Sequence, residues 1–435
     1  MILELNTGDT AWVLTSASLV LLMTPGLALF YGGMVRAKSV LNMIMMSFLS
    51  IGIVGVLWVL YGYSMSSATS IGGLVGNPLE YFGLNGIIGT PDDGTPTFAG
   101  VAFGSTFAII TVALISGAIA DRVRFSTWAV FSVIWATLVY FPVAHWVWGD
   151  GGWIGSLGVI DFAGGTAIHI NAGAAALVLA LVVGPRLGFG TRPMRPHNMT
   201  LVMLGAALLW FGWFGFNAGS AGAADAIASL AWVNTLAAPA AAMLGWLLVE
   251  KLRDGHATSL GAASGIVAGL VGITPAAGSL NPVGSLILGL VAGVACAYAV
   301  GLKYRFNYDD SLDVVGVHLV GGMVGTLLIG LLADPSIPDT AAGLFYGGGF
   351  GLLGIQALGA FSATAYSLVV TLVIALILKS VMGWRVSPAE ELGGIDLAQH
   401  SEAGYDLSPV YYSSKVQRTL VLSADDLPLT EKTGV

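Results

Sequence analysis

Two histidines have positions that suggest chemistry. His169 lies in the stretch DFAGGTAIHINAG and His318 in the stretch DVVGVHLVGG, and both stretches are otherwise mainly apolar and rich in glycine. Asp161 precedes the first histidine by eight residues, and Asp313 precedes the second by five. A neutral imidazole pair can share an N–H···N bond and still present ring edges to a small polar solute or to a proton.

Other interpretations of these residues stay open. Each histidine could be a hydrogen-bonded packing residue, or the two could form a di-histidine metal site. No further His, Cys or Glu lies in these stretches, so a metal would be incompletely coordinated. Asp161 either caps free backbone N–H groups at the start of a helix or ligates a cation directly.

Several aromatic residues have spacing that suits a cation site. Trp213, Phe216 and Ser220 lie at positions i, i+3 and i+7 and therefore share one helical face. Phe107 and Trp148 belong to two other apolar stretches. An aromatic face attracts a cation by about 2 kcal/mol or more once the cation is desolvated. The alternative is an ordinary aromatic belt at the membrane interface.

The composition predicts that membrane-spanning helices position these residues. Of the 435 residues, 56% are hydrophobic and only 9% are charged, and the mean hydropathy is +0.85. A soluble domain usually carries about 25% charged residues. The net charge of −8 supplies no basic surface for nucleic acid. The single cysteine, Cys296, excludes an intrachain disulfide and a multi-cysteine metal site. We therefore expect an all-α polytopic membrane protein.

Eleven apolar stretches are long enough to cross a bilayer. They cover residues 10–35, 39–63, 98–120, 126–144, 162–184, 199–218, 226–249, 258–275, 283–302, 312–333 and 344–378. The last would be roughly 50 Å long at about 1.5 Å per residue. We expect it to tilt strongly or to project into the cytosol.

The basic residues predict the orientation. All 16 Lys and Arg residues follow an odd-numbered span, so all of them fall on one side of the membrane. The positive-inside rule makes that side cytosolic, with the N-terminus outside and the C-terminus inside. They are Arg36, Lys38, Arg122, Arg124, Arg186, Arg192, Arg195, Lys251, Arg253, Lys303, Arg305, Lys379, Arg385, Lys415, Arg418 and Lys432.

The spans divide into five, five and one. Spans one to five start outside and spans six to ten start inside, so similar halves would be inverted copies with a substrate path at their interface. We predict a transmembrane domain over residues 1–380 and a cytosolic tail over 381–435. Within that domain the first half is 1–184, the second half is 185–333, and the long last helix is 344–378.

The motifs resemble those of ammonium transporters of the Amt/Mep/Rh family, nearer its Amt branch. The resemblance runs from TPGLALFYGG (24–33) through DFAGGTAIHINAG, GWFGFNAGSA and DVVGVHLVGG to the tail segment RVSPAEELGGIDLAQHSEAGYD (385–406). It covers nearly the whole chain, and these motifs are specific. Chain length and the eleven-span, N-out topology agree with it.

The resemblance implies a role for each outer aromatic residue. Phe107, Trp148 and Ser220 would form an outer recruitment site, where cation–π contacts and one hydrogen-bond acceptor hold NH4+. Phe107 and Phe216 would be a stacked phenyl gate beneath that site. Trp148 separates this chain from Rh-type relatives, which generally lack the tryptophan.

The resemblance also implies the interior of the pore. His169 and His318 would be the twin histidines of a narrow hydrophobic pore, and Trp213 would line the same path. Asp161 would be the structural aspartate close to the outer site. The protein would bind and deprotonate NH4+ and conduct NH3, with net charge transfer as our hypothesis.

The expected setting is the cell membrane, with the lipid bilayer and ammonium or ammonia as partners. The resemblance implies a homotrimer with one pore per subunit and a tail that binds a cytosolic PII-type regulator. No cofactor and no enzymatic activity are expected. A membrane enzyme would need a nucleophile, a metal set or a cofactor motif, and GGG (347–349) opens an apolar helix without a phosphate-binding pattern.

Two other functions remain open. One is an electroneutral NH3 channel. The other is an ammonium sensor with little flux; sensor relatives carry fused signalling domains, and the roughly 30 residues after Tyr405 are too few for one.

Overall fold

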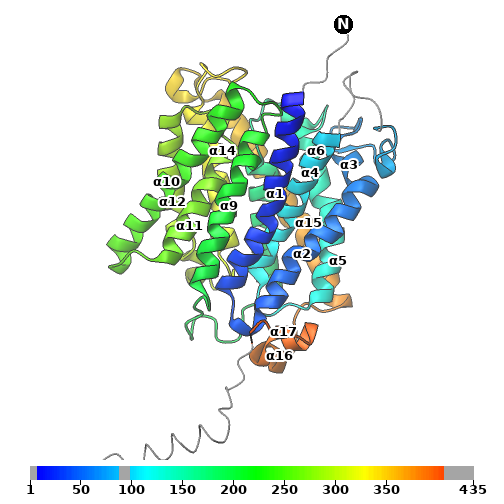
Figure 1. Cartoon of the computed structure of the whole chain (residues 1–435), viewed down its shortest axis with the longest axis vertical. Helices are drawn as coiled ribbons and strands as arrows, with labels where there is room; N and C mark the ends of the chain where they lie inside the picture. The colour runs from blue at the N-terminus through cyan, green and yellow to red at the C-terminus, as the bar shows by residue number, and fades with distance from the viewer. Residues whose placement is uncertain (1–6, 88–97, 406–435) are drawn as a thin grey trace, which may run out of the picture.

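The computed structural model describes residues 7–87 and 98–405 and is almost entirely helical. Long helices run side by side between the two ends of the molecule (Figure 1). The predicted tail continues beyond the described residues, and its Lys415, Arg418 and Lys432 lie outside them.

The first half of the chain contains five long helical stretches, several of them built from consecutive segments. The segments are α1 Thr7–Met34, η1 Ala37–Ser39, α2 Val40–Leu57, η2 Trp58–Gly62, α3 Tyr63–Ser67, β1 Ser70–Ile71, β2 Val75–Gly76, η3 Phe82–Leu84, α4 Phe98–Ile115, η4 Ser116–Ile119, α5 Phe125–Trp135, η5 Ala136–Tyr140, α6 Phe141–Trp148, α7 Trp153–Ser156, η6 Gly165–Ile170 and α8 Asn171–Val183. The two short strands pair antiparallel, with Ser70 opposite Gly76.

The rest of the chain also consists mainly of long helices and ends in two short ones. The segments are α9 Met199–Gly219, α10 Ala226–Asp254, α11 Ser259–Ile273, α12 Pro282–Ala299, α13 Leu302–Phe306, η7 Val315–Leu319, α14 Val320–Leu332, η8 Leu344–Tyr346, α15 Gly351–Val381, α16 Pro388–Gly393 and α17 Ile395–His400. Helices α16 and α17 lie at the end of the bundle opposite the start of α1 (Figure 1).

Ten helical stretches within the described residues are long and apolar enough to cross a membrane. The predicted span at 258–275 corresponds to α11, which has 15 residues and is therefore roughly 22 Å long. The prediction of an all-α polytopic membrane protein is confirmed. The count of eleven spans and the N-out orientation stay predictions.

The predicted start of the last helix is wrong. The sequence suggested a helix from residue 344, with GGG at its start, but α15 begins at Gly351. Gly347 and Gly349 adopt φ values of 86° and 68°, which lie in the left-handed region and cannot continue a right-handed helix. At 31 residues, α15 is still about 46 Å long.

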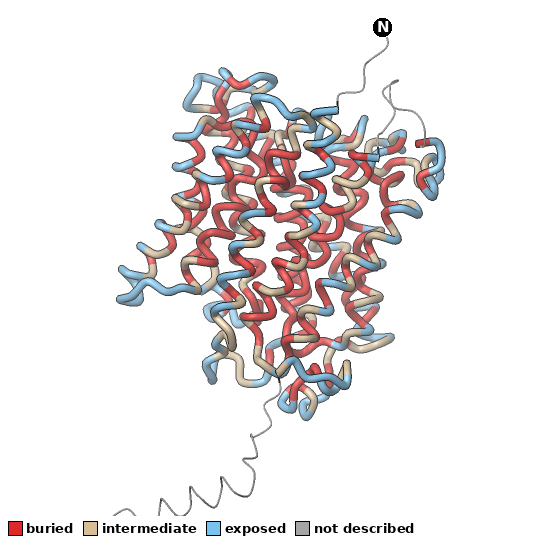
Figure 2. Tube along the Cα trace, in the orientation of Figure 1, coloured by how far each residue is buried: buried red, intermediate tan, exposed pale blue. Residues whose placement is uncertain are grey.

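Burial follows the pattern expected of a membrane protein. Buried residues fill the middle of the bundle, and exposed residues follow its flanks and ends (Figure 2). Many exposed flank residues are large and apolar, such as Leu181 at 60%, Leu244 at 64% and Val369 at 62% exposure. Contiguous apolar surface of this kind suits lipid rather than water.

The two histidine-bearing helices approach each other closely in the interior. A Cβ atom added to Gly173 of α8 would lie 2.4 Å from the backbone nitrogen of Leu319 in η7. Only glycine allows the two backbones to come this near. This contact brings the two helices together at the depth of the histidines.

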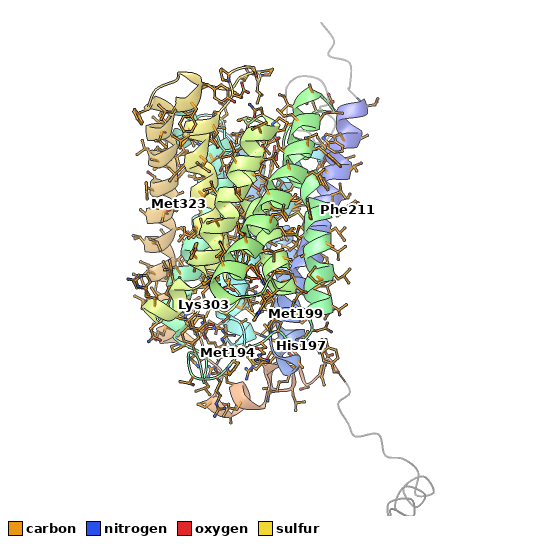
Figure 3. All side chains as sticks on the ribbon, turned by 90° about the vertical axis from the view of Figure 1, so that its left-hand side faces the viewer. Met194, His197, Met199, Phe211, Lys303 and Met323 are labelled. Carbon is orange, nitrogen blue, oxygen red and sulfur yellow. The ribbon has the colours of Figure 1, made fainter. Side chains whose placement is uncertain are left out.

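Charged residues from distant spans meet at one end of the bundle. Asp121 lies 3.6 Å from Arg36 and 3.5 Å from Arg186. Met194, His197 and Lys303 lie towards the same end, near α16 and α17 (Figure 3). Ends of the first, third, fifth and ninth predicted spans therefore lie at the same end of the bundle, as the distribution of basic residues along the sequence predicts.

Candidate functional site

The imidazoles of His169 and His318 lie against each other in the interior. Their Nδ1 atoms are 3.2 Å apart, and the ring planes differ by 24°. Both side chains are buried, with 1% and 3% exposure. One Nδ1 must carry a proton and donate it to the other, because two lone pairs would repel. The Nε2 atom of His169 has no hydrogen-bond partner in the described structure, so it is free to meet a solute.

Each histidine sits in a π-helical turn at the start of its helix. His169 belongs to η6, which α8 continues, and His318 belongs to η7, which α14 continues. π-Turns are rare and often mark functional sites, because the wider turn displaces side chains from regular helical positions. The two turns therefore place the imidazoles where regular α-helices would not.

Asp161 caps the helix of His169. Its Oδ1 accepts hydrogen bonds from Gly164 and Gly165 N–H at 3.0 and 2.6 Å. Its Oδ2 accepts from Thr166 and Ala167 N–H at 2.9 and 3.1 Å. A carboxylate so placed also complements the positive end of the helix dipole. Of the two sequence interpretations, the geometry is that of a cap.

The corresponding cap of the second helix is Asp310, not Asp313. The Asp310 carboxylate accepts from Val314 N–H at 3.0 Å and from Val315 N–H at 2.7 Å. Asp313 instead has a left-handed φ of 65° and pairs with Lys303 at 2.6 Å. The sequence predicts Asp313 as the counterpart of Asp161, because each precedes its histidine in a glycine-rich stretch, and this match is wrong. A signal was available, since Asp310 precedes His318 by eight residues, the same spacing as in the first half.

Apolar side chains enclose the paired imidazoles in a narrow lumen. The cavity there measures about 10 Å³, close to the smallest volume that holds one water molecule. Trp213 lies against His169, with ring centroids 5.4 Å apart, and its Nε1 donates to Thr274 Oγ1 at 2.8 Å. The other apolar lining residues are Met23, Leu27, Phe30, Ile110, Leu114, Leu209 and Val267.

A stacked phenyl pair separates this lumen from a larger cavity. The rings of Phe107 and Phe216 are parallel within 4°, with centroids 4.3 Å apart. Phe107 lines the larger cavity, and Phe216 lines the lumen. Their exposures of 5% and 1% show that little space is left around them. A solute would have to displace these rings to pass.

The larger cavity, of about 240 Å³, has mainly aromatic walls. Trp148 meets Phe107 edge to face, with centroids 6.0 Å apart, and its indole Nε1 donates to the Asp161 carbonyl at 2.9 Å. Ser220 also lines the cavity, and its hydroxyl donates to Phe216 O at 2.8 Å. That bond uses the Ser220 proton and leaves the oxygen as an acceptor. Residues predicted from three separate spans thus surround one space.

Similarity to a known protein family identifies the family of this chain. The family model described as Ammonium Transporter Family matches residues 11–405, most of the chain. The chain belongs to the ammonium transporter family. It is 58% identical to the ammonium transporter of Mycobacterium tuberculosis over 432 residues, which cover 92% of this chain and 91% of that protein.

Solved structures agree with this membership of the ammonium transporter family. The crystal structure of Saccharomyces cerevisiae Mep2 is similar with a TM-score of 0.85 at 34% identity, covering 94% of this chain and 95% of that chain. The structure named Sensor Amt Protein is similar with a TM-score of 0.84 at 30% identity, covering 90% and 98%. These likenesses extend over the whole bundle, and the chain is a multi-pass membrane protein.

A third cavity lies at the other end of the bundle in this ammonium transporter family member. It measures about 350 Å³ and is lined by charged residues that include Arg36, Asp121, Arg186 and Lys303. The sequence identified these basic residues only as markers of the cytosolic side. The site residues therefore delimit three cavities, namely the aromatic cavity, the lumen and this charged cavity, and the phenyl pair lies between the first two.

The di-histidine metal site finds no additional ligands. Among the described residues, no group of three or more His, Cys, Asp or Glu side chains is close enough to hold a metal ion. The two imidazoles also face each other through Nδ1 rather than converging on a common point.

Proposed function

We propose that this protein transports ammonium by binding NH4+ in the outer aromatic cavity and conducting NH3 past the paired histidines. One observation carries the proposal: a stacked phenyl pair divides an aromatic cavity from a narrow, mainly apolar lumen that holds two imidazoles in contact. The ammonium transporter family and the names of the relatives support the substrate.

The outer cavity offers the interactions that a small cation needs. Phe107 and Trp148 present ring faces and edges, and Ser220 provides an acceptor oxygen. Cation–π attraction is about 0.5–1 kcal/mol at exposed sites and about 2 kcal/mol or more when the cation is desolvated. Trp148 is 40% exposed, so the site binds weakly at its open side and more strongly against Phe107.

The lumen favours a neutral solute. An ion moved from water into a dry protein interior has an idealised penalty on the order of 20 kcal/mol. Aromatic contacts offset only a small part of this, and the lumen lining supplies no charged side chain. Loss of a proton before the phenyl pair removes most of the penalty. Ammonia can then hydrogen-bond to the free edge of the imidazole pair.

The proton released at the outer site either returns outside or crosses separately. If it crosses, for example along the histidines, net charge moves and the membrane potential drives uptake by about 2.3 kcal/mol per 100 mV. We propose this electrogenic mode. The test is a current recording on proteoliposomes after ammonium addition: transient currents support the mode, and ammonia flux without current would establish a neutral NH3 channel.

Sensing is a second candidate, favoured by the similarity to the structure named Sensor Amt Protein. The described tail is held against the membrane domain, because Asp396 accepts from Leu41 and Asn42 N–H at 3.0 and 2.8 Å. Ammonium binding that changed the tail without flux would favour a sensor. Measurable uptake in liposomes would favour transport.

The assembly and the partners also belong to the proposal. We expect a homotrimer with one pore per subunit, N-termini outside, and a cytosolic PII-type regulator at the tail. Native mass spectrometry in detergent would test the trimer, and pull-down with the tail removed would test the regulator.

A further inference from the structure

Gln356 is a buried polar residue that neither the pore nor the outer cavity includes. It lies in the second turn of α15 and is 0% exposed. Isolated amides in an apolar interior are unfavourable unless every group is hydrogen-bonded. The Gln356 oxygen and both amide hydrogens are hydrogen-bonded, and one of the bonded residues is adjacent to Asp161.

The Gln356 amide forms hydrogen bonds with both backbone groups of Ile160, which lies in the segment before η6. Its Oε1 accepts from Ile160 N–H at 2.7 Å, and its Nε2 donates to Ile160 O at 2.8 Å. The second Nε2 hydrogen is directed to Thr326 O of α14 at 3.2 Å. The amide orientation is unambiguous, because only Oε1 can accept from a backbone N–H. Gln356 thus joins α15, the second histidine helix and the segment before the first.

Ile160 immediately precedes Asp161. The Asp161 carboxylate caps η6, while its backbone carbonyl accepts from the Trp148 indole at 2.9 Å. On the far side, Phe162 N–H donates to Pro275 O at 3.0 Å. The backbone around Asp161 is therefore held on both sides, by Gln356 before it and by Pro275, in the turn after α11, behind it.

We infer that Gln356 is a positioning residue for the outer ammonium site. It holds the peptide groups of Ile160, which set the place of the Asp161 carbonyl and so the orientation of the Trp148 indole over the cavity. Without the amide, two partly buried backbone groups of Ile160 lose their partners, and the segment must rearrange to recover them. The inference rests on the proposed function, because the outer cavity must bind ammonium for its geometry to matter.

The test measures ammonium-dependent currents in proteoliposomes for Gln356→Met, which keeps the chain length and removes the amide. We expect the half-saturating ammonium concentration to rise about two- to threefold, no more than loss of the Trp148 indole itself would cause, with a smaller change in the maximal current. Gln356→Asn keeps an amide one methylene short and should give a smaller rise. It also serves if the Met variant does not elute as a folded protein in size-exclusion chromatography.

A double-mutant cycle separates positioning from a general loss of stability. Trp148→Phe keeps an aromatic ring but removes the indole donor to Asp161, so Gln356→Met should add little in that background. Ser367→Ala is the matched control, since Ser367 is buried on the same helix and donates to Asn171 O at 2.8 Å, away from the 160–163 segment. It should leave the half-saturating concentration unchanged.

The outcomes distinguish the two claims. Absence of both saturable ammonium current and ammonia flux in the wild-type protein would refute the proposed function. With wild-type transport intact, an unchanged half-saturating concentration in both Gln356 variants would overturn the inference. Full additivity with Trp148→Phe, or an equal effect of Ser367→Ala, would overturn it as well.

Discussion

Asp161 and Asp310 occupy equivalent positions in the two histidine helices. Each lies eight residues before its histidine, and each carboxylate accepts hydrogen bonds from backbone N–H groups four and five residues ahead. The two helices come from opposite halves of the chain. A repeated motif at the place where the imidazoles meet is what the predicted repeat would produce, and the inverted orientation of the halves stays a prediction.

The cap at Asp310 should contribute directly to stability. Asp310→Asn keeps one acceptor but loses the charge, and a hydrogen bond to a charged group is worth about 1.5–3 kcal/mol. We expect a lower unfolding temperature in detergent by differential scanning fluorimetry. Asp161→Asn should lower it further, since that carboxylate accepts four hydrogen bonds.

Asp254→Asn is the control for this prediction. Asp254 pairs with Arg253 at the surface, where the two side chains are 46% and 41% exposed. Surface ion pairs contribute about 0–1 kcal/mol. A loss of stability in Asp254→Asn as large as that in Asp310→Asn would contradict the assignment of the cap.

Removal of either paired imidazole should impair conduction. His169→Ala and His318→Ala each delete a hydrogen-bonding edge in the lumen, and one lost hydrogen bond of about 1.4 kcal/mol corresponds to about tenfold in rate. We expect ammonium currents to fall about tenfold and discrimination against potassium to weaken. His256→Ala, at an exposed position, is the control. Unchanged transport and selectivity in both pore variants would refute the twin-histidine role.

Loss of the outer indole should weaken ammonium binding. Trp148 is 40% exposed, so its cation–π contribution lies at the lower end of the range, about 0.5–1 kcal/mol. We expect Trp148→Leu to raise the half-saturating ammonium concentration about two- to fivefold. The comparison is Trp232→Leu on α10, where the indole is 43% exposed but outside the outer cavity. Equal shifts in the two variants would argue against an outer tryptophan site.

Acidification should remove a contribution of Asp309 to stability. Burial raises the pKa of this carboxyl, but the hydrogen bond from Arg186 and the charges of Arg122 and Arg186 outweigh that effect and leave the pKa below its usual value. A lowered folded-state pKa stabilises the protein above the unfolded-state value of about 3.9 and ceases to do so as the pH falls through the folded-state value.

The measurement is the unfolding temperature of the wild-type protein and of Asp309→Asn between pH 7 and pH 3. The wild-type protein should be the more stable of the two at pH 7, and the difference should shrink only below about pH 4. A difference that stayed constant over the whole range would show that the Asp309 charge does not contribute.

The sequence predicted much of the site because its residues lie in short, distinctive motifs. Helical spacing placed Phe216 and Ser220 on one face, and in the structure Ser220 lines the aromatic cavity and Phe216 lines the lumen. It failed where backbone geometry intervened. Asp313 has a positive φ and does not cap the second histidine helix. Gly347 and Gly349 also have positive φ values, and α15 begins only after them, at Gly351. Positive φ values are poorly visible in a sequence, particularly at an aspartate.

The sequence by itself determined that this chain crosses a membrane many times, that its basic residues follow alternate spans, and that two histidines lie in its apolar interior. Those properties follow from composition and from local order along the chain. Only the tertiary structure decided that the imidazoles meet at 3.2 Å, that Phe107 and Phe216 stack, and that Gln356 holds the residue before Asp161. Each of these contacts joins residues from different helices, whose separation depends on how closely the helices pack. That packing is set by small residues such as Gly173 and by side-chain shape in three dimensions.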